Sequence, residues 1–164
     1  LLALLLIAQV AFGYYLGEVP RGTPARTIYV NMHKTTGLIF ALLILYRLYW
    51  RLTHRAPPLP DRVPALQQKI AGLTHVGLYL CMLVLPISGY VASNYSKFGV
   101  KLFNSWTLPP WGPDDKAIYG LLNTTHKTAA IVFVVLVVVH VLGAVKHLLA
   151  RDTDLLRRML PGLR

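Results

Sequence analysis

Charge, acidic residues and cysteine are all scarce in this sequence. Of its 164 residues, 14% are charged and 55% are hydrophobic, whereas an average soluble domain carries about 25% charged residues. The hydrophobic residues are grouped in long blocks, which indicates an integral membrane protein of single-domain size. The one cysteine, Cys81, lies inside such a block. It allows neither an internal disulfide nor a thiolate metal site, and we interpret it as a small buried hydrophobic residue.

The few acidic residues, Glu18 among them, all lie outside the apolar blocks. A histidine-lined proton transporter would need acidic side chains in its spans, so this distribution argues against one. The 17 Lys and Arg give the chain a net charge of +11. They form no basic face with interleaved aromatic residues, so we expect no nucleic-acid partner. Lys and Arg flanking membrane spans explain the charge better, and the expected partner is a lipid bilayer.

Four apolar blocks predict membrane helices, each of which takes about 20 mostly apolar residues to cross a bilayer. The blocks cover approximately residues 1–16, 30–50, 70–92 and 125–150. The β-branched run in the last block would favour a strand in water, but its length favours a helix in lipid. The sequence therefore predicts an all-α, integral membrane four-helix bundle that forms a single domain over residues 1–164.

The first block opens without a polar lead-in. It is similar to the apolar part of a signal peptide, but no clear cleavage site follows, and Tyr14 and Tyr15 suggest a membrane interface. We interpret it as a first helix whose N-terminal end is missing. The longest linker, residues 93–123, is rich in aromatic residues and proline. We expect it to form an ordered cap at the membrane surface.

Basic residues are distributed unequally between the two sides of the predicted spans. The linker between the second and third spans and the C-terminal tail together carry ten Lys and Arg. The other side carries seven, with three of the six acidic residues. Because basic residues concentrate on the cytoplasmic side of membrane proteins, we expect both termini in the cytoplasm.

Two similar segments, NMHKTTGLIFALL and NTTHKTAAIVFVV, each place a His-Lys-Thr triplet before an apolar run. The triplets put His33 and His126 at the start of the second and fourth predicted helices. Both helices start on the outer side, so the two histidines lie at equal depth. Paired histidines on facing helices are typical axial ligands of a haem iron. Lys34 and Lys127 either pair with haem propionates or extend to the membrane surface.

A second set of histidines lies deeper. His140 follows His126 by 14 positions, which corresponds to roughly 21 Å along nearly the same helix face. His147 lies a further seven positions on, and His75 lies at a similar level on the third span. A second haem at His140 would need such a partner. A zinc site is disfavoured because the histidines are too far apart, and His54 is interpreted as a solvated loop residue.

Six segments in order resemble the bacterial cytochrome b561 family, which also includes cytochrome b subunits of nickel–iron hydrogenases. They are NMHKTTG, RLYWRLTHRAPPLP, HVGLYLCMLVLPISGY, FGVKLFNSWTLPPW, THKTAA and KHLLARDTDLLRRMLPG. The resemblance covers nearly the whole chain, and its single-domain length is more similar to the b561 branch. It implies two haem b groups.

By this resemblance, the outer haem is held by His33 and His126. The inner haem is held by His140 and a histidine expected about two residues before Leu1. In this chain His75 or His147 would substitute for it, or would lie beside the inner haem or a quinone site. Arg47 and Arg51 either reach the inner propionates or anchor the helix at the membrane.

The resemblance also implies a function in the bacterial inner membrane. Electrons would pass from a periplasmic donor, with superoxide as one candidate, through both haems to ubiquinone near the inner face. Such a chain would be a quinone-linked oxidoreductase without a catalytic side chain of its own, because the haems supply the chemistry. The alternative is an electron-transfer cytochrome b subunit that docks with a hydrogenase or dehydrogenase.

Overall fold

The computed structural model of the chain describes residues 2–54 and 64–149, without the side chains of residues 147 and 148. Its elements are α1 (Leu2–Glu18), α2 (Pro24–Thr53), α3 (Ala65–Asn94), β1 (Val100–Leu102), β2 (Trp106–Leu108) and α4 (Lys116–Leu149). α2, α3 and α4 are long and apolar enough to cross a membrane, and α1 is a shorter apolar helix. The predicted all-α membrane bundle is confirmed, whereas the two short strands were not predicted.

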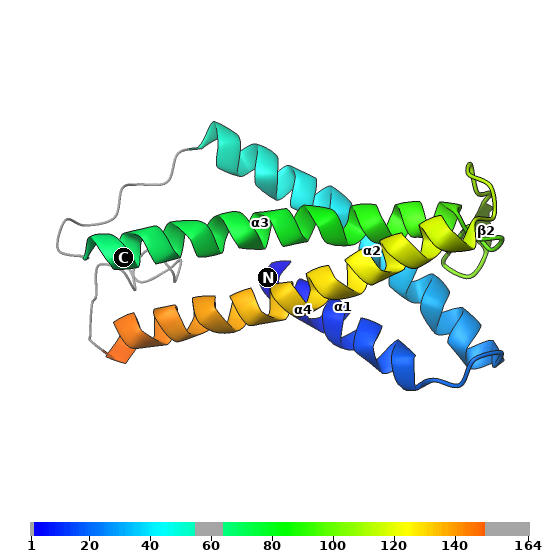
Figure 1. The fold of residues 1–164 in the computed structure, drawn as a ribbon, viewed down its shortest axis with the longest axis horizontal. Helices are drawn as coiled ribbons and strands as arrows, with labels where there is room; N and C mark the ends of the chain where they lie inside the picture. The colour runs from blue at the N-terminus through cyan, green and yellow to red at the C-terminus, as the bar shows by residue number, and fades with distance from the viewer. Residues whose placement is uncertain (1, 55–63, 150–164) are drawn as a thin grey trace.

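The helices form two packed pairs. α3 and α4 lie side by side along the long axis of the molecule, and α2 crosses them at an angle while α1 packs against α2 (Figure 1). α2 and α4 run in the same direction and α3 runs in the opposite one (Figure 1). The starts of α2 and α4 therefore lie at one end of the bundle, beside the β1–β2 hairpin. We call this the hairpin end, and the opposite end the far end.

α2 and α4 begin before their apolar runs, at polar capping residues. The Thr23 side chain accepts a hydrogen bond from a backbone N–H of the first turn of α2 at 3.3 Å, and Pro24 follows it at the first helical position. The Asp115 carboxylate accepts from the backbone N–H groups of Ala117 and Ile118 at 2.8 and 3.0 Å. Such caps satisfy donors that a helix start leaves free, and they set where both helices begin.

The early starts place both His-Lys-Thr triplets inside helices, so the prediction that they begin the helices is wrong. His33 lies nine positions after Pro24, and His126 lies ten positions after Lys116. Each histidine is therefore roughly 14 Å from the start of its helix. The apolar run in the sequence predicts only the apolar part of each helix, and the polar first turns before it were missed. Because the two shifts are nearly equal, the histidines still lie at matching depth.

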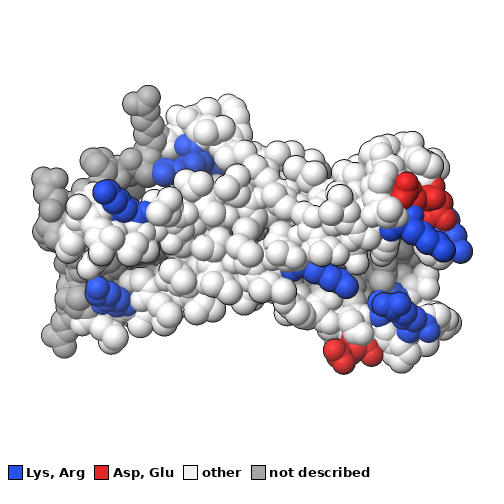
Figure 2. Space-filling view, in the orientation of Figure 1, with Lys and Arg blue, Asp and Glu red and all other residues white. Residues whose placement is uncertain are grey.

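Charged side chains gather at the two ends of the bundle. Figure 2 shows Lys and Arg at both ends, acidic side chains at the hairpin end, and between them a surface that is uncharged apart from one basic patch nearer the hairpin end. An uncharged belt fits the hydrocarbon layer of a bilayer, where an exposed charge is costly. The surface thus agrees with the three spans identified from helix length and hydropathy.

All four helices contribute to one buried apolar cluster in the middle of the bundle. Its members are Leu6, Ile44, Cys81 and Phe133, which are between 2 and 9% exposed. Cys81 is free and buried, as predicted. Phe133 lies seven positions from His126 and seven from His140, so the cluster forms an apolar layer about 10 Å along the helix from each histidine.

The hairpin has a tight turn at its tip. β1 and β2 pair in antiparallel register, with Val100 opposite Leu108 and Leu102 opposite Trp106. At the tip, Phe103 and Asn104 adopt positive φ angles of 49° and 59°. Asparagine tolerates this left-handed region, but it is unfavourable for a bulky residue such as phenylalanine. The turn conformation therefore needs support from outside the hairpin.

That support comes from α2, at residues next to His33. Thr35 Oγ1 accepts a hydrogen bond from the Phe103 backbone N–H at 3.0 Å, and Lys34 Nζ donates to the Gly99 carbonyl at 2.7 Å. The Asn31 side-chain amide donates to Asn104 Oδ1 at 2.8 Å. The hairpin is thus docked on the helix segment that carries His33, and an ordered cap is present in this linker as predicted.

Candidate functional site

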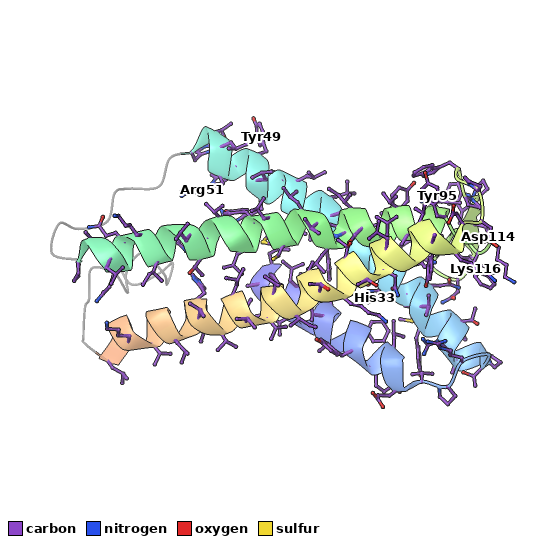
Figure 3. The ribbon with its side chains drawn as sticks, viewed as in Figure 1. His33, Tyr49, Arg51, Tyr95, Asp114 and Lys116 are labelled. Atoms are coloured by element: carbon purple, nitrogen blue, oxygen red, sulfur yellow. The ribbon has the colours of Figure 1, made fainter. Side chains whose placement is uncertain are left out.

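His33 and His126 come together at the hairpin end, on helices that are otherwise not extensively packed on each other. Their ring centroids are 6.2 Å apart and the ring planes are nearly perpendicular, at 85°. His33 comes from α2 and His126 from α4, and Figure 3 shows His33 where α2 passes α4. α2 and α4 share little direct backbone packing. The two rings therefore approach edge to face between two helices that are not packed together. We call His33 and His126 the hairpin-end pair.

The His126 ring is held by a backbone carbonyl of α3. Its Nδ1 lies 2.8 Å from the Leu85 carbonyl oxygen, which can only accept a hydrogen bond. Nδ1 therefore carries the proton and donates it, which leaves the lone pair on Nε2. This is the arrangement in which a histidine binds a metal, because the bond from the other nitrogen fixes both tautomer and ring orientation. The Ser88 hydroxyl lies 3.4 Å from the same Nδ1.

Glycines lie against both rings of the hairpin-end pair. A Cβ placed on Gly89 of α3 would lie 3.0 Å from Cε1 and Nδ1 of His126. A Cβ placed on Gly13 of α1 would lie 3.1 Å from Cε1 of His33. Contacts this short are closer than side-chain carbons normally make, so the absence of a side chain at both positions provides room for the two imidazoles.

His75 and His140 form a second pair, which we call the far-end pair. Their ring centroids are 5.2 Å apart, with an angle of 58° between the planes. Both side chains are exposed, and within the described part of the chain neither ring nitrogen has a hydrogen bond. Figure 3 shows Arg51, in the last turn of α2, at the far end of the bundle. The structure therefore places His140 beside His75, the histidine that the sequence predicted to lie at a similar depth.

The remaining predicted site residues are placed less clearly. Lys34 is occupied with the Gly99 carbonyl, whereas Lys127, its counterpart in the second triplet, is exposed. Arg47 is exposed on α2. The side chain of His147 lies outside the described part of the chain. His54 is exposed as predicted, but it caps the end of α2 and stacks on Trp50, with ring centroids 3.7 Å apart.

The sequence did not single out Gln9, Gly13, Leu85 or Gly89. A backbone carbonyl such as that of Leu85 carries no sequence signal, because every residue has one. The glycines also gave no signal, since glycine is frequent in membrane helices. Gln9 was visible as the one amide within an otherwise apolar helix, and it is the residue that sequence reasoning could have found.

The geometry of the hairpin-end pair fits two axial ligands of one metal. A bond from a metal to an imidazole nitrogen is about 2 Å long, so rings on opposite sides of one metal have centroids about 6 Å apart. Among residues 2–54 and 64–149, no three His, Cys, Asp or Glu side chains gather to hold a metal by themselves. Two histidines suffice where a macrocycle supplies the other ligands, and haem b has this arrangement.

Comparisons with known proteins point the same way. The sequence model of a family described as prokaryotic cytochrome b561 matches residues 1–162. Cytochrome b561 homolog 2 of Escherichia coli (strain K12) is 31% identical over 131 residues, which cover 79% of this chain and 69% of the homolog. Cytochrome b561 homolog 1 of the same organism is 28% identical over 144 residues, covering 87% and 81%. No solved structure matches the chain.

Proposed function

Because the chain belongs to the prokaryotic cytochrome b561 family, whose members are membrane b-type cytochromes that transfer electrons, we propose that it holds two haem b groups in series. His33 and His126 hold the first, and His75 and His140 hold the second. The observation that carries this proposal is the pairing of rings at two levels. The His33 and His126 centroids, 6.2 Å apart, already have the spacing for one shared metal, whereas the His75 and His140 centroids, 5.2 Å apart, would have to separate by about 1 Å to hold one. Haem b, when bound, supplies a one-electron carrier at each level.

The side chains around the two pairs provide the surroundings that such carriers need. The bond from His126 Nδ1 to the Leu85 carbonyl presents Nε2 as a ligand. The apolar cluster around Phe133 lies between the two pairs and excludes water from the middle of the bundle. Burial and nearby charge are the means by which a protein adjusts the potential of a bound haem.

Haem quantitation of the purified chain tests the assignment. We expect two haems per chain from the pyridine haemochrome and the reduced-minus-oxidised spectrum, and one haem in each of the variants His33→Ala and His75→Ala. A wild-type chain without haem would contradict the proposal as a whole. Two haems in His75→Ala would contradict only the far-end pair. That result would favour the ligand set of the family resemblance, in which His75 is not a ligand of the inner haem.

The direction of electron flow follows from the resemblance and from the distribution of charge. We propose that the hairpin end faces the periplasm, because that side of the spans carries seven Lys and Arg and the other side carries ten. A periplasmic donor, with superoxide as the first candidate, would deliver electrons there, and ubiquinone would accept them near the far-end pair. Purified chain in liposomes should then reduce a ubiquinone analogue when superoxide is generated outside, and His33→Ala should abolish this activity. A haem-loaded wild-type chain that does not reduce the quinone analogue would favour the alternative function, an electron-transfer subunit of a hydrogenase or dehydrogenase.

A further inference from the structure

The two histidines of the hairpin-end pair are oriented in different ways. The His126 ring is fixed by the hydrogen bond from Nδ1 to the Leu85 carbonyl. His33 Nδ1 is buried and has no hydrogen-bond partner within residues 2–54 and 64–149. Among the described residues, no hydrogen bond on Nδ1 therefore sets the rotation of the His33 ring. Its orientation depends on what packs around it and on the position of its backbone.

One face of α1 provides this packing. Gln9, Phe12 and Gly13 are spaced at i, i+3 and i+4, so they lie on the same side of the helix. The Phe12 ring lies 6.0 Å from the His33 ring, centroid to centroid, at an angle of 54°. The backbone of Gly13 approaches so closely that a Cβ there would lie 3.1 Å from His33 Cε1. A small slide of α1 along α2 would therefore move the His33 imidazole.

Gln9 fixes the position of α1 against α2 at the level of His33. Its Nε2 donates to the His33 backbone carbonyl at 2.8 Å, and its Oε1 accepts from the Thr36 hydroxyl at 2.8 Å. The orientation of the amide follows from chemistry, because a carbonyl can only accept a hydrogen bond and must face the amide nitrogen. Both ends of the amide are thus paired across the two helices, within a segment that has no other polar side chain on α1 before Tyr14.

We propose that Gln9 is a positioning residue for His33. Its two hydrogen bonds hold the register of α1, and the register holds Phe12 and Gly13 against the His33 ring. This inference rests on the proposed function, in which His33 would help to hold the hairpin-end haem. Gln9 acts through α1 and α2 and does not itself contact the bound iron.

The variant Gln9→Met tests the role with little risk to folding. Methionine has similar length and suits an apolar helix, and Thr36 keeps the Met32 carbonyl as an alternative acceptor at 2.9 Å. A second pair of variants tests the packing directly. Gly13→Ala adds a Cβ against His33, whereas Gly17→Ala, one turn further along α1, adds one where nothing lies within 4 Å.

The measurement is the low-spin ferric EPR spectrum of purified, haem-loaded protein, with the two signals assigned from the single-haem variants. We expect Gln9→Met and Gly13→Ala to displace the signal of the hairpin-end haem and to leave the far-end signal and the haem content unchanged. Gly17→Ala and Thr125→Val should match the wild type, since among the described residues the Thr125 hydroxyl bonds only to the Leu121 carbonyl of its own helix.

The outcomes separate this inference from the proposed function. A haem-loaded wild type whose hairpin-end signal is unmoved by Gln9→Met would overturn the positioning role alone. The same holds if Gly17→Ala moves the signal as far as Gly13→Ala does. A wild-type chain that binds no haem would overturn the proposed function, and the positioning role with it.

Discussion

The two histidine pairs present the same imidazole chemistry in different surroundings. At the hairpin end, glycines lie against both rings, a carbonyl fixes His126, and the hairpin is docked beside His33. At the far end, His75 and His140 are exposed within the described structure and have no hydrogen bond to their ring nitrogens there. The far-end rings are also 1 Å closer, at 5.2 Å against 6.2 Å.

This difference indicates that the two sites respond to different kinds of change. The hairpin-end rings are held by close packing, in which even one added carbon is felt. The far-end rings are exposed, and Arg51 in the last turn of α2 lies at the same end of the bundle. We therefore expect the hairpin-end site to be sensitive to side-chain volume and the far-end site to be sensitive to charge.

The largest effect is expected from adding a carbon against His126. In Gly89→Ala the new Cβ would lie 3.0 Å from the His126 ring, which the hydrogen bond to the Leu85 carbonyl holds in place. Overpacking of this kind costs about 1–3 kcal/mol. We expect most of the hairpin-end haem to be lost, as measured by haem content per chain, with the far-end haem retained.

The matched variant is Gly77→Ala, also on α3. Its Cβ would lie 2.9 Å from Leu136 Cδ1, which is the end of a flexible side chain and can turn away. Both haems should remain in this variant. If Gly77→Ala lost as much haem as Gly89→Ala, the difference in packing between the two sites would not hold.

A smaller effect is expected from releasing the hairpin. Lys34→Met removes the bond to the Gly99 carbonyl, and a hydrogen bond from a charged group contributes about 1.5–3 kcal/mol. Hydrogen–deuterium exchange of the hairpin amides should accelerate about tenfold or more, since each 1.4 kcal/mol is a factor of ten. Lys127→Met removes the exposed lysine of the second triplet and should leave the exchange unchanged. Equal exchange in the two variants would show that Lys34 does not hold the cap.

A change of charge should affect the far-end site alone. A nearby positive charge favours the reduced form of a haem, which carries one more electron. Arg51→Gln should therefore lower the midpoint potential of the far-end haem, by an amount on the order of tens of millivolts for a solvent-screened charge. Potentiometric titration measures both haems in one experiment. Arg51→Lys keeps the positive charge and serves as the control. A shift of the hairpin-end potential alone in Arg51→Gln would contradict the comparison.

The smallest effect is expected at Ser88. Its hydroxyl donates to the Val84 carbonyl at 2.6 Å and lies 3.4 Å from His126 Nδ1, which already donates to Leu85. Ser88→Ala should thus leave the hairpin-end EPR signal in place. A displacement as large as that of Gly13→Ala would mean that Ser88, and not the Leu85 carbonyl, orients the ring.

Much of the bundle follows from the sequence, because the requirements of a membrane are simple. Apolar length and low charge predicted the helices, and equal spacing from the outer surface predicted that His33 and His126 meet. The helix starts were placed too late, since hydropathy does not register the caps at Thr23 and Asp115. The hairpin was expected only as an ordered cap, because its turn depends on Thr35, 68 positions away from Phe103 along the chain.

By itself, the sequence determined that the chain lies in a membrane, which segments form helices, and at what depth each histidine lies. These properties depend only on the composition of each segment and on the rise per residue of its helix. The tertiary structure alone decided which histidine lies beside His140, which carbonyl holds His126, and that Gln9 reaches the backbone of His33. These contacts join residues on different helices. They depend on how the helices rotate and slide against one another, and packing across the whole bundle settles that register.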